Sequence, residues 1–442
     1  MLKTVRNAFK IKDIRNKLLF TFMALIIVRI GSLLPAPGVD QGYISEFLKA
    51  NFGSGLSFLD SFTGGSFSKM SLFALGIGPY ITSSIIMQLL TIAIPKLEEL
   101  QKDGEDGKKK IAEISRYLTI GLAIVESIAM IIGFGNSQVL EGGLSFKNFV
   151  VITVTFTAGS AFLMWLGERI TEKGVGNGIS VILMINIVAG MPTDITGLYN
   201  KFITGQPVVK GLLSGIFIIA IIVLLVVLVI LLQNAQRKIA VQYAKKVQGR
   251  KMVGGQSSFI PLKVNTAGVI PVIFAISLMQ FPIIICSLFG VAAERAYFWP
   301  KVLYMLNSQN WFDLDNGAFK YTVGVLIYMA LLVFFAYFYT SITFNPVEVA
   351  NNMKKQGGFI PGIRPGKPTS EYLTKVLNYI IFIGAMGLMI VALIPIAFSG
   401  LFNAQVSFGG TSIIIVVGVV LETMKQIESQ MLVRHYKGFL ND

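Results

Sequence analysis

The stretch ALGIGPYITSSIIMQLL, residues 74–90, is apolar enough to lie in a membrane but contains residues that a lipid-facing helix does not need. It opens with two glycines and a proline, and it carries Thr82 and Gln88 between spaced isoleucines. Ile77 and Ile81 are four residues apart, which places them on one face of a helix. Polar or irregular backbone survives at membrane depth only where protein or a water-filled cavity covers it. We therefore expect this stretch to face the interior of a membrane protein.

The composition of the whole chain supports a membrane location. Of its 442 residues, 54% are hydrophobic and 14% are charged, whereas ordinary soluble domains have about 25% charged residues. The single cysteine, Cys286, excludes a disulfide framework and a thiolate metal site. The single histidine, His435, lies in a basic tail, where a catalytic role is not expected. The sequence therefore predicts an integral membrane protein without a cofactor.

Ten apolar segments approach the length of about 20 residues that crosses a bilayer. The first follows a basic leader, and we interpret it as a retained span rather than a cleaved signal peptide. An even number of spans places both chain ends on one side of the membrane. The predicted spans are 18–34, 71–93, 115–134, 149–168, 176–191, 212–233, 264–289, 319–343, 374–398 and 410–431.

The distribution of lysine and arginine predicts the orientation. If the N-terminus is cytosolic, the loops on that side hold 28 of the 38 basic residues and the opposite loops hold eight. Cytoplasmic loops carry such an excess, so both termini are predicted to be cytosolic. We divide the chain into 1–191 with five spans, 192–263 with the sixth span and a basic loop, and 264–442 with four spans. Five spans plus five would permit two inverted halves.

Two of the predicted cytosolic loops, 233–265 and 344–373, are unusually long and basic. They are either ordinary loops that set the topology or a docking surface for a polyanionic partner, such as RNA or an acidic protein face. Their length, charge density and glycine–proline content favour docking.

The sequence offers little for catalysis. Ionisable residues within the predicted spans are Arg29, Glu126, Glu422 and Lys425. Arg29 is near the end of its span, where a long side chain can reach the interface. There is no nucleotide-binding loop, no HExxH motif and no nucleophile elbow. We therefore predict that the chain is not an enzyme.

Two further stretches repeat the opening pattern of glycine, polar residues and spaced aliphatic residues, namely GVGNGISVI (174–182) and NTAGVIPVIFAIS (265–277). This pattern is typical of helix packing through small residues. It also suits a channel whose narrowest point is an aliphatic ring that excludes water. Residues 53–71 are glycine-rich and too short to span, so they form either an external loop or a re-entrant segment that fills a cavity.

These stretches resemble the SecY family of protein-conducting channel subunits, nearly from end to end. The resemblance implies an all-α integral membrane protein of ten transmembrane helices, in two inverted five-helix halves around a central pore. It also implies that unfolded secretory polypeptides pass through the pore and that membrane segments leave through a lateral gate. The motifs that carry it are VRIGSLLPAPGVD, SLFALGIGPYITSSIIMQLL, GKKKIAEISRYLTI, MWLGERITEKGVGNGIS, QRKIAVQYAKK, PLKVNTAGVIPVIFA, FYTSITFNPVEVANNMKKQGGFIPGIRPGKPT and FGGTSIIIVVGVVLETMKQIESQ.

The resemblance also implies site residues. The pore ring would consist of Ile77, Ile81, Ile179, Leu183, Ile273 and Ile415. The plug, segment 58–67, would include Phe58, Leu59, Asp60, Ser61, Phe62, Gly64, Gly65 and Phe67. Polar candidates at the lateral gate, between the second and seventh spans, are Thr82, Gln88, Asn265 and Ser277. Docking candidates are Arg237, Lys238, Lys245, Lys246, Arg250, Lys251, Lys354, Lys355 and Arg364.

The partners implied by the resemblance are the SecE and SecG subunits, the SecA motor ATPase, the ribosome through RNA contact with the basic loops, preproteins with signal sequences, and anionic lipids. The implied location is the bacterial cytoplasmic (inner) membrane. A secondary transporter for a small solute would share interrupted helices, but the charges for ion coupling are missing and a transporter does not need the basic loops. A membrane scaffold would explain neither the aliphatic ring nor the plug-like stretch.

Overall fold

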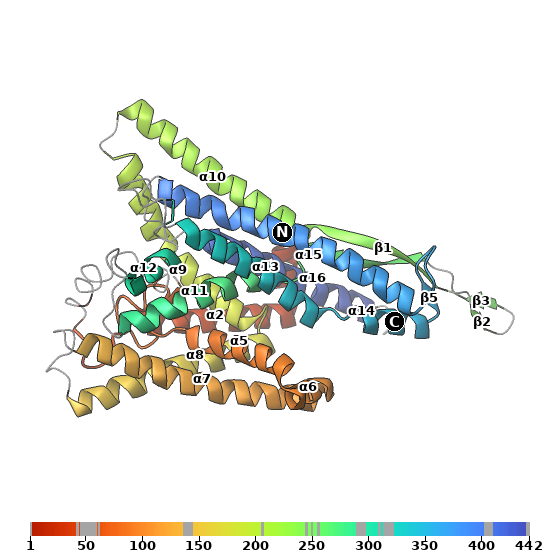
Figure 1. Cartoon of the computed structure of the whole chain (residues 1–442), viewed down its shortest axis with the longest axis horizontal. Helices are drawn as coiled ribbons and strands as arrows, with labels where there is room; N and C mark the ends of the chain where they lie inside the picture. Colours follow the sequence, from red (N-terminus) through yellow and green to blue (C-terminus); the bar gives the residue numbers. More distant parts are fainter. Residues whose placement is uncertain are drawn as a thin grey trace.

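The structure is a computed structural model. It describes residues 2–40, 44, 60, 62–135, 145–204, 207–243, 246–248, 251–253, 257–288, 298–307, 311–312, 322–401 and 410–438. Most of its long helices run along the long axis of the molecule (Figure 1). Ten helices match the ten predicted spans in order: α2 (Lys12–Leu33), α5 (Gly78–Ala93), α7 (Gly104–Gly135), α8 (Phe146–Lys173), α9 (Gly178–Phe202), α10 (Val208–Asn234), α11 (Ile270–Leu288), α13 (Val323–Thr343), α15 (Lys367–Leu401) and α16 (Gly410–Gly438).

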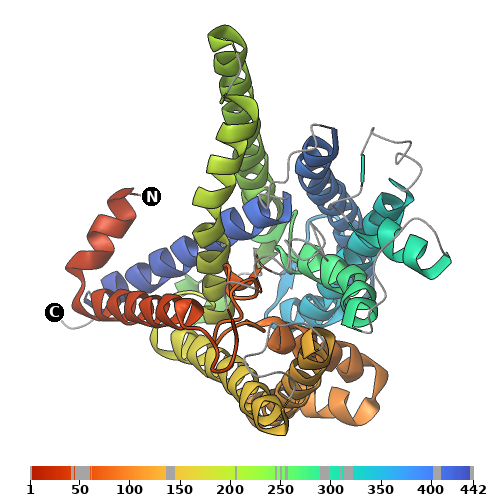
Figure 2. The same cartoon turned by 90° about the vertical axis from the view of Figure 1, so that its left-hand side faces the viewer.

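Within the described residues, seven helices are individually long and apolar enough to cross a membrane. An eighth crossing is made if α5 is counted with the short helix α6 (Pro95–Lys102), from which it is separated by a bend of 101°. The most apolar helix, α10, is only 11% buried in its apolar window and lies at an edge of the bundle (Figure 2). Because such a surface is stable only in hydrocarbon, α10 marks the lipid-facing boundary.

The second span differs from its prediction at its start. The predicted span begins at residue 71, but residues 72–77 form turns and α5 begins at Gly78. Gly76 adopts a left-handed backbone with φ +58°. Pro79 lies in the first turn of α5, where its missing N–H has no helical partner to lose. The proline therefore starts the helix rather than bending it.

The two basic loops are not separate. Strands β1 (Gln236–Tyr243) and β4 (Ser257–Lys263) pair antiparallel, and β5 (Gly358–Phe359), from the second loop, pairs with the other edge of β1. A smaller pair, β2 (Lys246–Gln248) and β3 (Lys251–Val253), extends the hairpin. The sheet and α14 (Pro346–Lys355) share a hydrophobic core with the start of α15. The two loops thus form one small unit.

The short elements mark the two ends of the molecule. The sheet, α6 and α14 lie at one end, and α12 (Phe298–Leu306) lies at the other (Figure 1). We call these the sheet end and the α12 end. The three most basic internal segments of the chain, 95–116, 234–263 and 344–375, belong to elements at the sheet end.

The two largest hydrophobic clusters of the described residues lie inside the helical bundle. The larger one joins α10, α11, α13, α15 and α16 around Tyr328 and Leu332 of α13. The second draws side chains from α2, α5, α8, α9, α11 and α16. Because the second cluster joins helices from both halves of the chain, it is one place where those halves meet.

Candidate functional site

Six aliphatic side chains meet in the second cluster. They come from the start of α5, from α9, from α11 and from α16, so helices far apart in sequence converge on one point. Three of them are buried, a fourth is 9% exposed, and Ile81 and Ile179 are partly buried. They are the six residues of the predicted pore ring, here called the aliphatic ring: Ile77, Ile81, Ile179, Leu183, Ile273 and Ile415.

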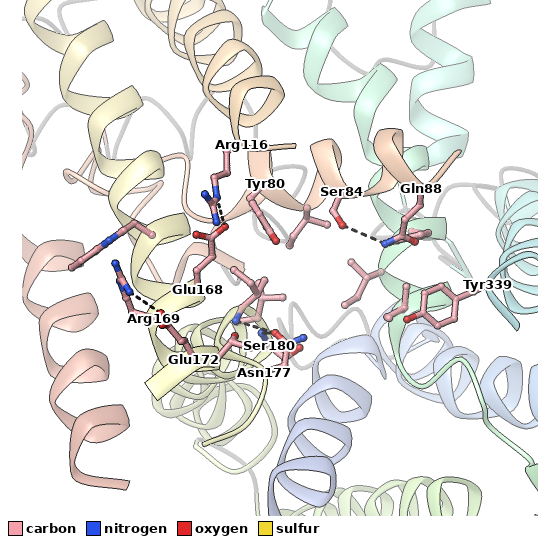
Figure 3. A pocket seen from close by; sticks show the side chains of 18 residues that line it. Tyr80, Ser84, Gln88, Arg116, Glu168, Arg169, Glu172, Asn177, Ser180 and Tyr339 are labelled. Atoms are coloured by element: carbon pink, nitrogen blue, oxygen red, sulfur yellow. Dashed lines mark hydrogen bonds and ion pairs between the residues drawn. The ribbon is translucent and has the colours of Figure 1, made fainter. Parts of the chain in front are cut away.

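A cavity of about 680 Å³ opens on one side of the aliphatic ring. Four ring residues line it, together with polar side chains from α5, α8, α9 and α13 (Figure 3). It lies where α8 ends and α9 begins, since Glu172 and Asn177 both belong to its wall. Asn177 caps α9 by accepting hydrogen bonds from the N–H groups of Ile179 and Ser180. The cavity, here called the vestibule, is therefore lined both by polar or charged side chains and by apolar residues of the ring.

Two ion pairs stand in the vestibule wall. Arg116 of α7 donates from Nε to Oε1 of Glu168 on α8 at 2.8 Å, and Nη1 of Arg169 lies 2.7 Å from Oε2 of Glu172. The Arg169 guanidinium also lies 5.8 Å from the ring centroid of Trp165. Because the side chains of each pair are partly exposed, each ion pair contributes only about 0–1 kcal/mol to the free energy of unfolding. Their main effect is to keep the wall hydrophilic without a large net charge.

A compact segment lies on the other side of the ring. Asp60 and residues 62–70, here called the plug-like segment, contain much of the predicted plug. Asp60 holds the segment together: its carbonyl accepts from Gly65 N at 2.9 Å and its Oδ1 accepts from Ser68 N at 2.8 Å. Phe62 packs against the ring cluster, and Phe67 packs against the cluster around Met70. Phe58, Leu59 and Ser61 of the predicted plug lie outside the described residues.

Two helices bind the backbone of this segment. Nη1 of Arg29, on α2, donates to the carbonyl of Gly64 at 3.2 Å. Nδ2 of Asn186, on α9, donates to the carbonyl of Phe62 at 3.1 Å. Gly64 has φ +67°, and a Cβ there would lie 2.7 Å from Arg29 Nη1 and 3.0 Å from Asn186 Cα. Gly65 has φ +83° but faces open space.

The structure separates the four predicted gate residues. Gln88 lines the vestibule with Ile270 and Phe274 of α11, and its Nε2 donates to Ser84 Oγ at 3.3 Å. Thr82 and Ser277 are half-buried outside that wall. Asn265 is buried and donates to the carbonyl of Gly268, within the turn before α11. Of the four, Gln88 is the one that the structure brings into a cavity shared by α5 and α11.

Five of the docking candidates are exposed at the sheet end. Arg237 and Lys238 lie on β1, and the ammonium of Lys238 lies 4.7 Å from the Phe259 ring centroid. Lys354 and Lys355 lie in the last turn of α14, and Arg364 lies in the turn that follows β5. Lys246 and Lys251 lie on β2 and β3; Lys245 and Arg250 lie outside the described residues.

Two residues of the site were not predicted from the sequence. Arg29 was expected to extend to the membrane interface, whereas its guanidinium lies against the plug-like segment. Asn186, which is 2% exposed, was not among the predicted site residues. A signal existed for both, because a charged or amide side chain in an apolar helix is expected to have a partner in the protein interior.

This arrangement can be compared with known proteins. The family model described as SecY matches residues 71–424. The protein translocase subunit SecY of Halalkalibacterium halodurans is 44% identical to the chain, over the full length of both. The chain belongs to the SecY family. The predicted resemblance is confirmed, and so is the predicted function, that of a channel subunit of a protein translocase and not an enzyme.

Solved structures share the fold of this SecY-family chain. A SecY protein whose plug domain stabilises the closed state of the translocation channel has a TM-score of 0.61 and 19% identity, over 94% of this chain and 92% of that one. The Sec61 channel of a canine ribosome–channel complex has a TM-score of 0.59 and 16% identity, over the same shares. The predicted helical, multi-pass membrane fold is confirmed, with one small β-structured unit at the sheet end.

Proposed function

We propose that the aliphatic ring is the narrowest point of the path that an unfolded polypeptide takes through this channel subunit. The convergence of six aliphatic side chains from four helices, between a polar vestibule and a plug-like segment, carries the proposal. An aliphatic constriction excludes water and ions by dewetting and needs no charge to do so. It also has no hydrogen-bonding groups, so it places no sequence requirement on the chain that passes.

The plug-like segment closes the channel on the α12 side of the ring in the resting state. Along α9, Ser180 lines the vestibule, Leu183 belongs to the ring and Asn186 binds the plug-like segment. This order of residues along one helix supports a path in which the vestibule, the ring and the plug-like segment follow one another. The plug domain of the related SecY protein, which stabilises the closed state, supports the same role here.

Membrane segments leave sideways between α5 and α11. The two helices both line the vestibule, and polar Ser84 and Gln88 lie on the α5 side. A helix–helix contact that contains polar side chains costs less free energy to separate than a fully apolar, interdigitated contact. The reason is that its polar groups can form hydrogen bonds with water or with a passing chain once the helices part. Thr82, Asn265 and Ser277 remain predicted members of this gate.

The exposed basic residues of the sheet end dock the partners that supply unfolded chains. The Sec61 channel of the canine ribosome–channel complex supports a ribosome as one such partner, and the SecA motor is the other. SecE, SecG, signal-bearing preproteins and anionic lipids complete the proposed partners. Since the three most basic internal segments share one end, we place that end and both termini in the cytosol of a bacterium, and the chain in its cytoplasmic membrane.

A crosslinking experiment tests the path. A photocrosslinking residue replaces Ile81 or Ile273 in the channel reconstituted in vesicles, and a preprotein is arrested halfway through. We expect both positions to crosslink to a short window of the arrested chain. The control position is Ile92, which is on α5 like Ile81 but 52% exposed on its outside. Crosslinks at Ile92 but none at Ile81 or Ile273, with translocation confirmed in the same vesicles, would refute the path.

A further inference from the structure

Two side chains hold the plug-like segment by its backbone rather than by its side chains. Arg29 and Asn186 donate to the carbonyls of Gly64 and Phe62, two residues apart, from two different helices. We propose that Arg29 and Asn186 form a latch that keeps the plug-like segment closed and releases it when the aliphatic ring widens. The proposal rests on the proposed function and names the residues that regulate it.

Asn186 is an amide in an apolar environment. It is 2% exposed, and the helix around it reads ILMINIVAG. Its Nδ2 donates to the Phe62 carbonyl at 3.1 Å, and its Oδ1 has no hydrogen-bond partner in the described part of the chain. A buried amide without partners is costly, so the contact with the plug-like segment is what compensates this side chain in the closed state. Once the segment leaves, the amide faces the pore and can be hydrated.

Arg29 supplies the stronger of the two contacts. It lies in the apolar part of α2 and makes no ion pair within the described residues. Its Nη1 donates to the Gly64 carbonyl at 3.2 Å. Hydrogen bonds from a charged donor are roughly twice as strong as neutral ones. Among the described residues, the positive charge of Arg29 is therefore directed at a backbone carbonyl of the plug-like segment.

The segment fits this latch because of Gly64. The left-handed backbone at φ +67° turns its carbonyl toward α2, and the missing Cβ lets its backbone approach Asn186 Cα. Any side chain at this position would occupy the space of the Arg29 guanidinium. The hydrogen bonds from Arg29 and Asn186 therefore depend on the close approach of the backbone at Gly64.

The latch is coupled to the ring through α9. Asn186 is three residues after Leu183, so the two side chains lie on nearly the same helix face, one turn apart. A movement of α9 that widens the ring at Leu183 also withdraws Asn186 from Phe62. Hydrogen bonds weaken steeply as the distance grows beyond about 3.2 Å, so a small widening is enough to release the segment.

Cysteine accessibility in the resting channel tests the latch. The probe is Ser66→Cys, in a Cys286→Ser background and in the full chain in vesicles. Ser66 lies in the plug-like segment, is 0% exposed and has an unpartnered Oγ among the described residues. The matched probe is Ser160→Cys on α8, which is 1% exposed and also unpartnered there. A membrane-impermeant maleimide measures the rate at which each thiol becomes accessible.

We expect Asn186→Leu to raise the labelling rate of Ser66→Cys about fivefold and Arg29→Gln about tenfold or more, as the loss of a neutral and of a charge-assisted hydrogen bond implies. Labelling of Ser160→Cys should not change. The control Arg15→Gln removes an exposed charge from the same helix as Arg29 and should leave both probes unchanged. An unchanged rate at Ser66→Cys, or an equal rise at both probes, would overturn the latch.

This outcome is separable from the proposed function. The labelling uses the resting channel without preprotein, whereas the path is tested by crosslinks to an arrested preprotein. A latch that fails while Ile81 and Ile273 still crosslink would refute the roles of Arg29 and Asn186 alone.

Discussion

The two sides of the aliphatic ring differ in how they are built. On the sheet-end side lies a hollow vestibule of about 680 Å³ with ion pairs and amides in its wall. On the α12 side lies the plug-like segment, which fills the space and is bonded to α2 and α9. The ring needs no partner to exclude water, whereas the plug-like segment depends on particular hydrogen bonds. In the proposed function, one seal is therefore unspecific and the other is specific and releasable.

This difference assigns different physical roles to the two seals. A dewetted ring can relax around a passing chain and close again behind it, because dispersion contacts have no required geometry. A segment held by two directional bonds is either in place or released. We propose that the ring and the plug-like segment both limit leakage at rest, and that the ring alone limits it during transport, when the plug-like segment has been released.

The largest expected effect comes from breaking the ring. Ile415 of α16 is 1% exposed, and Ile415→Asn would place an amide without partners among aliphatic side chains. Such burial costs about 1–3 kcal/mol in the closed state, and the amide also allows water to remain in the constriction. We expect resting ion flux through reconstituted channels to rise about tenfold or more. The control Val420→Asn, on the exposed face of the same helix, should leave the flux unchanged; equal flux in both variants would count against the ring.

A smaller effect is expected from loosening the plug-like segment. Gly64→Ala adds a Cβ that conflicts with Arg29 and with the α9 backbone, whereas Gly65→Ala adds one in open space. Both positions have positive φ, so each carries a backbone penalty of about 1–2 kcal/mol. The difference between the variants isolates the close contact. Resting ion flux should rise several-fold more in Gly64→Ala, and an equal rise would show that the contact with Arg29 and Asn186 does not matter.

The smallest effect is expected in the vestibule wall. Arg116→Gln removes the ion pair with Glu168, whose side chains are 46% and 29% exposed. Such a pair contributes about 1 kcal/mol or less, and its loss does not touch the ring or the plug-like segment. We expect a small decrease in Tm and no change in resting ion flux. A flux increase comparable to that of Ile415→Asn would show that the vestibule wall is itself a seal.

Hydropathy predicted the ten spans because each must bury about 20 apolar residues in hydrocarbon, and that requirement is local in sequence. It failed at residues 71–77, where apolar composition hid a series of turns that end just before α5 begins at Gly78. It also missed the β1–β4 hairpin, although QRKIAVQY alternates exposed and buried residues in the manner of a strand. The pairing with β5 joins loops more than 100 residues apart, which no local pattern can predict.

The candidate site also contains parts that local sequence predicts and parts that depend on long-range packing. The ring residues could be located because family motifs mark them, and because Ile77 with Ile81, and Ile179 with Leu183, repeat a helical spacing. The contacts of Arg29 and Asn186 with the plug-like segment join residues 35 and 124 positions apart. A residue type in a span shows that a partner must exist, but only the packing of α2 and α9 against the segment shows which.

The most direct test of the two-seal account is the resting ion flux of the double variant Ile415→Asn/Gly64→Ala, compared with both single variants in the same vesicles. Two independent barriers in series must both open for ions to pass, so the fold-changes of the single variants should multiply in the double variant. A double variant that conducts no more than Ile415→Asn alone would contradict the account, because it would mean that the ring is the whole barrier.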